Sequence, residues 1–298
     1  MTRNMNTKTL PLIDTHTELC AVIGNPIEHS LSPAMHNAAY RAIGMNAVYL
    51  AFHITDVAGC LGGMRAIPSF RGMSVTIPHK RAVMEYLDSI EPMALHVGSV
   101  NTITREDGCL IGSTTDGPGT IRAFDDAGIS LEGKRVLFTG SGGAVRAVVF
   151  AFAELTDAAQ LTILGRTPKH VEELVSDLRE RTDASVAGGE LVHDIESAMA
   201  EHDIIIQGTP IGMHPHPDAT CVPAEFIRSD HIVFDMVYRP YTTRLLEDAL
   251  TRGCTVIHGT EMLLNQAVLQ FERWFDVPAP REAMNTALLS SLSVPPSK

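Results

Sequence analysis

The stretch Arg135-Val-Leu-Phe-Thr-Gly140-Ser-Gly-Gly-Ala144 decides the fold that we expect of this chain. Its first part is mostly apolar, as a buried strand should be, and the glycine-rich turn leads into a helical stretch rich in Ala and Val. Glycines in such a turn let the backbone approach a pyrophosphate, whose charge the N-terminus of the following helix stabilises. The stretch therefore predicts a nucleotide-binding unit, although Val145 stands where the G-x-G-x-x-G pattern has its third glycine.

The end of the next strand indicates which nucleotide binds. An enzyme that uses NAD usually ends this strand with Asp or Glu, which binds the ribose 2′-OH. Here the chain reads Leu164-Gly-Arg166-Thr-Pro-Lys169-His170, and the first acid is Glu172. A guanidinium suits the 2′-phosphate of NADP through planar, charge-assisted hydrogen bonds, so we predict NADP as the cofactor. The alternative is that Arg166 is an ordinary exposed charge.

Strands and helices alternate along the chain without an internal repeat, and 298 residues suggest two domains. In the first part of the chain we expect helices near 33–43, 56–66 and 79–87, and strands near 20–24, 47–53, 72–76, 99–104 and 109–112. A second series of apolar runs follows Gly133, with helical stretches between its members at 135–139, 161–164, 203–206, 231–235 and 255–257. This alternation predicts an α/β fold with βαβ units and a parallel sheet.

Composition bounds the function without specifying it. The net charge is −12, and we expect no nucleic-acid partner because phosphate binding needs clustered Lys and Arg. No apolar run reaches the ~18 residues of a membrane span, and residues 1–18 lack the apolar core of a signal peptide. The five cysteines are dispersed without a CxxC, which indicates reduced and mostly buried thiols in a cytoplasmic protein. Composition leaves both a monomer and a homodimer open.

Polar side chains follow several of the expected strands. Met73-Ser-Val-Thr76-Ile-Pro78-His-Lys80 places a hydroxyl and an amine beyond a buried strand, which should stop at Pro78 because proline cannot donate to a sheet. Open α/β sheets bind ligands at such strand ends. Four further strings carry polar groups, namely Ser30-Leu-Ser32-Pro33, Val100-Asn101-Thr-Ile103, Gly112-Ser-Thr-Thr-Asp116-Gly117 and Met262-Leu-Leu-Asn-Gln266. Taken singly, each has a structural interpretation as a solvated lysine, a helix cap, a turn residue or a surface amide.

Taken together and in this order, the S-x-S, V-T-x-P-x-K, V-N-T, T-D-G and M-L-x-x-Q elements resemble the shikimate dehydrogenase family, from about Cys20 to about Phe275. The resemblance implies reversible reduction of 3-dehydroshikimate to shikimate with NADPH. It also implies two lobes, an N-terminal α/β/α substrate domain over residues 1–115, completed by 259–298, and a Rossmann-like NADP-binding domain over residues 116–258. The expected active site lies in the cleft between these lobes.

The resemblance also implies roles for individual residues. The catalytic pair is Lys80 and Asp116, and the residues that contact the polyol acid are Ser30, Ser32, Thr76, Asn101, Asp116, Tyr238 and Gln266. The predicted cofactor-binding residues are Gly140, Ser141, Gly142, Gly143, Ala144, Arg166, Thr167, Lys169, Thr209, Met236, Gly259 and Met262. Hydride transfer to a ketone creates an alkoxide that needs a proton, and a carboxylate beside Lys80 favours the charged ammonium that can supply it.

The chain also departs from the family pattern. Ser74 and Thr114 stand where the family usually has Asn. Gly165 replaces the Asn of N-R-T, and Gln207-Gly-Thr209 replaces N-A-T or N-T-T. Ser and Thr are shorter than Asn and hydrogen-bond differently, which leaves quinate or an amino analogue open as the substrate. Two alternatives therefore remain, a quinate/shikimate dehydrogenase that uses NAD and a catalytically silent nucleotide-binding regulatory protein of the same fold.

The histidines of the chain are expected to play structural parts. His29, His36 and His79 lie near the substrate strings and are expected to pack or cap rather than to act as general bases. His214-Pro-His216 has the look of a metal pair, but no further ligands lie at short spacing, so we predict no metal site.

Overall fold

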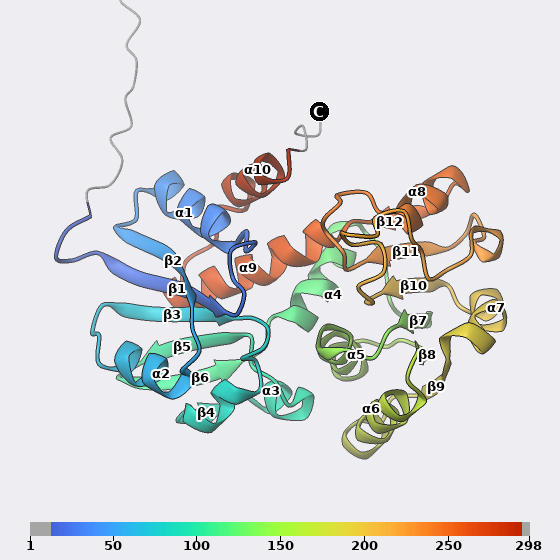
Figure 1. Cartoon of the computed structure of the whole chain (residues 1–298), viewed down its shortest axis with the longest axis horizontal. Coiled ribbons are helices and arrows are strands. Elements are labelled where there is room, and N and C mark those ends of the chain that lie inside the picture. Colours follow the sequence, from blue (N-terminus) through green and yellow to red (C-terminus); the bar gives the residue numbers. More distant parts are fainter. Residues whose placement is uncertain (1–12, 294–298) are drawn as a thin grey trace, which may run out of the picture.

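The structure is a computed structural model that describes residues 13–293, and what is predicted of residues 1–12 and 294–298 lies outside it. It contains two six-stranded sheets with helices packed on their faces. Figure 1 shows the first sheet, in blue to cyan, beside the second, in green to orange, with helices α4 and α9 between them. The predicted α/β fold with two lobes is confirmed.

The first sheet is mixed. Its strands are β1 (Glu18–Gly24), β2 (Ala47–His53), β3 (Phe70–Val75), β4 (Ser89–Ile90), β5 (Thr102–Glu106) and β6 (Cys109–Ser113), in the order β2-β1-β3-β5-β6-β4. β1 pairs in parallel with β2 and β3, whereas β5 runs antiparallel to both β3 and β6. The connecting helices are α1 (Ser32–Ile43), α2 (Val57–Arg65), the 3₁₀ helix Ala82–Tyr86 and α3 (Pro92–Val97).

Successive residues of β1 enter two different cores because side chains alternate across a sheet. Cys20 and Val22 pack with α1 and with the two last helices, α9 (Gly259–Phe275) and α10 (Arg281–Ser291). Ala21 and Ile23 pack on the opposite face with residues of α2 and α3. Burial on both faces explains why this strand is an uninterrupted apolar run, and it brings the C-terminal helices back to the first sheet.

The second sheet is parallel throughout. Its strands are β7 (Arg135–Thr139), β8 (Gln160–Gly165), β9 (Val186–Glu190), β10 (Ile204–Gln207), β11 (Ile232–Asp235) and β12 (Thr255–Ile257), in the order β12-β11-β10-β7-β8-β9. The connecting helices are α5 (Gly143–Leu155), α6 (Pro168–Arg181), α7 (Leu191–Glu201), the 3₁₀ helix Ala224–Phe226 and α8 (Arg244–Thr251). From β7 the strands are added on one side, through β8 to β9, and the chain then returns to place β10 on the other side of β7. The point between β7 and β10 is the topological switch point, where doubly wound sheets bind dinucleotides.

Helix α4 (Asp116–Asp126) joins the two sheets and packs unusually close to its neighbours. A Cβ added at Gly117 would lie 2.6 Å from the Ala147 carbonyl oxygen of α5. A Cβ added at Gly119 would lie 2.7 Å from the Gln266 backbone nitrogen of α9. Only glycine permits these approaches, so α4 holds α5 and α9 in a fixed relation.

The structure differs from the sequence expectations in local detail. The helix expected over 79–87 is a turn followed by the short 3₁₀ helix, and the strand expected from residue 99 begins at Thr102. The hydrophobic pattern of the sequence does not predict β4, α3 or β9. β4 and α3 are short, and β9 is rich in glycine. The expectation of mostly buried thiols is wrong, because all five cysteines are free but only Cys20 and Cys254 are buried. Within residues 13–293, no helix is both long and apolar enough to cross a bilayer.

We expect Gly119→Ala to lower the free energy of unfolding by about 1–3 kcal/mol, because the added methyl overpacks the contact of α4 with α9. Gly62→Ala is the matched control, since Gly62 is helical and exposed and its added Cβ would meet nothing within 4 Å. That substitution should raise the stability by about 0.4–1 kcal/mol. Urea unfolding of both variants measures the difference, and equal effects would contradict the proposed packing.

Candidate active site

A cavity of about 460 Å³ lies between the two sheets and gathers the predicted substrate and catalytic residues. Its walls come from the β1–α1 loop, the end of β3, the starts of α4 and α5, the loop after β11 and helix α9. Eight predicted residues line it, namely Ser30, Ser32, Thr76, Lys80, Asn101, Asp116, Tyr238 and Gln266. They come from sequence positions more than 200 residues apart, so the fold brings the separate strings to one place.

Lys80 and Asp116 form an ion pair at the edge of this cavity. The Lys80 Nζ atom lies 2.5 Å from Asp116 Oδ2, and the two side chains are 25% and 11% exposed. Asp116 is the first residue of α4, where the positive end of the helix dipole favours a carboxylate. The Lys80 carbonyl accepts a hydrogen bond from Val100 N–H at 2.8 Å, which ties the lysine turn to the segment before β5.

Asn101 holds the second oxygen of Asp116. Its Nδ2 donates to Asp116 Oδ1 at 2.7 Å. Its Oδ1 accepts from the Thr115 N–H and from the Thr102 hydroxyl, both at 2.8 Å. Because both of these groups donate to Oδ1, the amide is oriented with its NH₂ toward the carboxylate.

The two serines at the start of α1, Ser30 before the helix and Ser32 as its first residue, do not act as side-chain caps of that helix. The N-cap position is Leu31, and no side chain caps it, while Pro33 lies in the first turn as predicted. Ser30 Oγ receives only a long hydrogen bond of 3.4 Å from Ser32 N–H. Thr76, another predicted substrate-binding residue, follows β3 and is half-buried. The capping interpretation of Ser30 and Ser32 is therefore wrong, and their hydroxyls border the cavity.

The predicted cofactor residues fall into three groups. Gly143, Ala144, Met236, Gly259 and Met262 line the same cavity as Lys80. Ser141 and Gly142 line a neighbouring cavity of about 830 Å³ that also reaches Lys80 and Gly143. Arg166, Thr167, Lys169, Thr209 and Gly140 line neither cavity. The first three of these are exposed at the junction of β8 with α6, and Thr209 follows β10.

The glycine-rich turn has the geometry of a phosphate-binding loop. Gly140 has φ +103°, a left-handed conformation, and a Cβ there would lie 3.1 Å from the Gly208 carbonyl oxygen. Gly142 is the N-cap of α5, which has no side-chain cap, so the first N–H groups of this helix can bind an anion. The turn and the Gly208 segment follow β7 and β10, the two strands at the switch point.

Arg146 connects this phosphate loop to the substrate side. From the second turn of α5 its guanidinium donates to the Val97 carbonyl at 2.5 Å and to the His96 carbonyl at 3.3 Å, both at the end of α3. It also pairs with Asp177 of α6 at 2.7 Å. The segment after α3 leads directly to Asn101, so the helix that begins at the glycine turn is connected to the start of β5, beside which this predicted substrate-binding amide lies.

Comparison with known proteins agrees with this geometry. Residues 22–103 match the shikimate dehydrogenase substrate binding domain, and residues 259–289 match the shikimate 5'-dehydrogenase C-terminal domain. The shikimate dehydrogenase (NADP(+)) of Moorella thermoacetica is 40% identical over 291 residues, which covers 94% of this chain and 95% of the relative. The chain belongs to the shikimate dehydrogenase family.

Solved structures of family members resemble the whole chain. The Listeria monocytogenes shikimate 5-dehydrogenase, in complex with shikimate and NAD, superimposes with a TM-score of 0.88 at 36% identity and covers 93% of this chain and 98% of its own. A Corynebacterium glutamicum quinate dehydrogenase in complex with NAD has a TM-score of 0.86 at 28% identity and covers 92% of this chain and 99% of its own. The family predicted from the motifs is thus confirmed, and its solved members include proteins with another named substrate.

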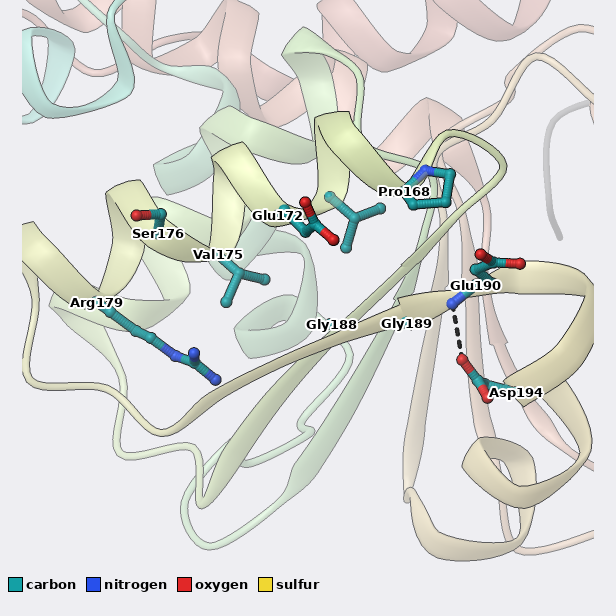
Figure 2. A pocket seen from close by; sticks show the side chains of 10 residues that line it. Pro168, Glu172, Val175, Ser176, Arg179, Gly188, Gly189, Glu190 and Asp194 are labelled. Carbon is teal, nitrogen blue, oxygen red and sulfur yellow. Dashed lines mark hydrogen bonds between the residues drawn. The ribbon is translucent and has the colours of Figure 1, made fainter.

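Another hollow, of about 500 Å³, contains none of the predicted site residues of this shikimate dehydrogenase family member. It lies between α6 and β9, at the outer edge of the second sheet, and Figure 2 shows Arg179 and Glu172 on one side of it and Gly188, Gly189 and Glu190 on the other. The Arg179 guanidinium donates to the Val186 carbonyl, and the Glu190 N–H donates to the Asp194 carboxylate. We assign it no part in the site.

Sequence reasoning missed Asp235, which lies under the loop that carries Met236 and Tyr238. Asp235 is fully buried, and its Oδ1 accepts from Val237 N–H at 2.9 Å and from Gln207 Nε2 at 3.0 Å. Its Oδ2 accepts from the Thr243 hydroxyl at 2.6 Å. The available signal is a polar residue at the end of each of the adjacent apolar strands β10 and β11, where Gln207 and Asp235 are paired.

Burial raises the pKa of Asp235 from 3.8 to about 6, although the three hydrogen bonds oppose this shift. Between these pH values the folded protein binds a proton that the unfolded chain releases. Stability should therefore fall as the pH rises from about 4 to about 6, by at most about 3 kcal/mol from this group. Below about pH 4 both states are protonated, and the contribution is constant.

We expect Asp235→Asn to remove this fall, because the amide does not ionise and its NH₂ can still face Thr243. Urea unfolding at intervals from pH 4 to pH 7 gives the slope of stability against pH. Asp230→Asn is the control, since Asp230 is exposed and its pKa is lowered, so any contribution that it makes to stability rises with pH instead of falling. Parallel stability curves for the parent protein and Asp235→Asn would show that Asp235 is not the group concerned.

Proposed function

We propose that this chain catalyses the reversible, NADPH-dependent reduction of 3-dehydroshikimate to shikimate. The observation that carries the proposal is the Lys80–Asp116 ion pair, which borders a cavity lined by further hydroxyl and amide side chains. The name of the Moorella thermoacetica relative, a shikimate dehydrogenase (NADP(+)), and the shikimate bound in the Listeria monocytogenes structure support the same reaction. The five free thiols fit a cytoplasmic location, where cysteines stay reduced.

In this proposal the protein supplies the proton of the reaction. The nicotinamide, when bound, supplies a hydride to the C3 carbonyl carbon of the substrate. The Lys80 ammonium donates a proton to the developing alkoxide, and the same positive charge stabilises that oxygen before the proton moves. Asp116 holds the ammonium in place, and Asn101 holds Asp116 through its other oxygen.

The polar lining accounts for recognition of a hydroxylated ring acid. We assign the carboxylate to Ser30 and Ser32, and the ring hydroxyls to Asn101, Asp116 and Gln266. Thr76 and Tyr238 complete the lining on the β3 side and on the side of the loop after β11. A site that binds each hydroxyl can reject an analogue that lacks one by about 10⁴-fold, because its own buried polar groups are then left unpaired.

The cofactor residues fit NADPH. The left-handed Gly140 and the uncapped start of α5 suit the pyrophosphate. Ser141 to Ala144 lie along that turn, and Met236, Gly259 and Met262 border the Lys80 cavity where the nicotinamide must reach the substrate. Arg166, Thr167 and Lys169 offer two cations and a hydroxyl for the 2′-phosphate, and Thr209 lies across the switch point from Gly140. Residues 1–115 with 259–298 then form the substrate lobe, and 116–258 the cofactor lobe.

The second candidate is oxidation of quinate with NAD, the alternative that Ser74 and Thr114 leave open at the positions where the family usually has Asn. The test is an assay of 3-dehydroshikimate reduction and of shikimate and quinate oxidation, each with both cofactors. Faster turnover of quinate with NAD would replace the main proposal. A complete lack of turnover on all three acids, with NADPH still bound, would favour the catalytically silent regulatory protein instead.

Lys80→Ala should lower kcat by at least about 100-fold, because general acid catalysis typically contributes that much or more. The affinity for NADPH should change less than about twofold, since no cofactor phosphate is assigned to Lys80. Lys134→Ala is the matched control, because Lys134 is half-buried at the start of the second sheet and far from the cavity. Near-normal turnover of Lys80→Ala would remove Lys80 from the proton-transfer step.

Arg166→Ala should raise the KM for NADPH about tenfold or more, because a hydrogen bond between charged groups contributes about 1.5–3 kcal/mol. The KM for NADH should stay the same, since NADH carries no 2′-phosphate. Initial rates with NADPH and with NADH at saturating 3-dehydroshikimate measure the ratio. An equal rise for both cofactors would place Arg166 outside the 2′-phosphate site.

A further inference from the structure

Ser74, which replaces an Asn of the family, lies within a buried hydrogen-bonded chain that ends at the catalytic pair. The Tyr49 hydroxyl donates to Ser74 Oγ at 2.6 Å, and Ser74 Oγ donates to Gln270 Oε1 at 2.7 Å. Ser74 and Gln270 both border the substrate cavity, and Gln270 comes from α9, 196 residues further along the chain. None of the family motifs includes Tyr49 or Gln270.

The chain continues from Gln270 to Asp116. Gln270 Nε2 donates to Thr102 Oγ1 at 2.9 Å, and the Thr102 hydroxyl donates to Asn101 Oδ1 at 2.8 Å. Asn101 Nδ2 then donates to Asp116 Oδ1 at 2.7 Å. All of these residues are at most 8% exposed, so bulk water cannot readily replace a lost member.

The direction of each hydrogen bond follows from the groups that can only donate or only accept. The Asn101 main-chain carbonyl lies 3.5 Å from Gln270 Nε2 and can only accept, which orients the Gln270 amide with its NH₂ toward Thr102. Thr102 Oγ1 therefore accepts from Gln270. Its single proton has two acceptors within reach, Asn101 Oδ1 at 2.8 Å and Thr115 Oγ1 at 3.2 Å, and the shorter distance favours Asn101. Burial raises the pKa of Tyr49 above its usual range, so its hydroxyl keeps the proton that it gives to Ser74.

We propose that Gln270 is a positioning residue that acts through Thr102 on Asn101. By directing the Thr102 proton to Asn101 Oδ1, Gln270 adds a second donor to the Thr115 N–H, and the two together hold the amide with its NH₂ toward Asp116 and keep the carboxylate aligned with Lys80. Both polar atoms of Gln270 are already bonded to protein, which separates its role from that of the substrate-binding Gln266 one turn earlier. The inference rests on the proposed function, because the alignment matters for the Lys80–Asp116 reaction.

The test compares three variants with the parent protein. Gln270→Met keeps an unbranched side chain of similar length but removes both hydrogen bonds. Gln270→Glu keeps the acceptor for Ser74 and replaces the NH₂ by an oxygen that attracts the Thr102 proton away from Asn101. Thr102→Val removes the hydroxyl between Gln270 and Asn101. Asn265→Leu is the matched control, since Asn265 is a buried amide of the same helix that bonds instead to Asp126.

We expect Gln270→Met to lower kcat for shikimate oxidation about tenfold, which is the effect of about 1.4 kcal/mol, and to leave the KM for NADP⁺ within twofold. Gln270→Glu should lower kcat further, because the Thr102 hydroxyl then donates to the new carboxylate instead of to Asn101. The double variant Gln270→Met with Thr102→Val should be no slower than the slower single variant, because the two residues act in one line. Thr102→Ser keeps the hydroxyl that Thr102→Val removes, so its kcat should be near that of the parent protein. Asn265→Leu should also have the parental kcat.

Parental kcat in both Gln270 variants, or losses that multiply in the double variant, would overturn the proposal. If the parent protein oxidises neither shikimate nor quinate, the proposed function fails separately. The positioning is then judged without turnover, from the side-chain amide resonance of Asn101 in ¹⁵N-labelled protein. That resonance should shift and exchange faster in Gln270→Met and Thr102→Val, and an unchanged resonance would refute the positioning. If Gln270→Met does not fold, Gln270→Glu and Thr102→Val carry the same test.

Discussion

The active-site geometry depends on three chain segments that meet at one carboxylate. Lys80 lies in the turn after β3, Asn101 precedes β5, and Asp116 begins α4. Main-chain hydrogen bonds join the first two segments, because Val100 N–H donates to the Lys80 carbonyl at 2.8 Å and Val75 N–H to the Asn101 carbonyl at 2.7 Å. The ammonium and the amide therefore reach Asp116 from a backbone that is already ordered. Such preorganisation removes part of the entropic cost of bringing reacting groups together.

Helix α4 transmits this geometry to the rest of the molecule. Its first residue is Asp116, which supplies the carboxylate. Gly117 lies against α5, and Gly119 lies against α9 beside Gln266. The helix that carries the phosphate-binding turn and the helix that carries the substrate amide are thus positioned against the same short element. Because both contacts are made at glycines without room for a methyl group, α4 packs closely against the helices on both sides of the cavity.

Much of the site could be predicted from the sequence because its motifs lie at strand ends and helix starts. Such positions share one edge of a sheet, so Ser30, Thr76, Lys80 and Asp116 meet once the strand order is known. The helix expected over 79–87 fails for a tertiary reason, because Leu87 is already extended (φ −96°, ψ 149°) to let β4 pair with β6. Tyr49 and Gln270 could not be found in this way, since their contact with Ser74 depends on how α9 returns to the first sheet. Neither residue stands at a strand end.

The two replacements of Asn differ in their physical consequences. At Ser74 the lost amide is replaced by one from another element, because Gln270 accepts from the serine hydroxyl and donates onward to Thr102. At Thr114 there is no such replacement, and Oγ1 is buried without a protein partner in the described part of the chain. The hydrogen-bonded chain is therefore continuous from Ser74 through Gln270, Thr102 and Asn101 to Asp116. Thr114, two residues before that carboxylate, takes no part in it.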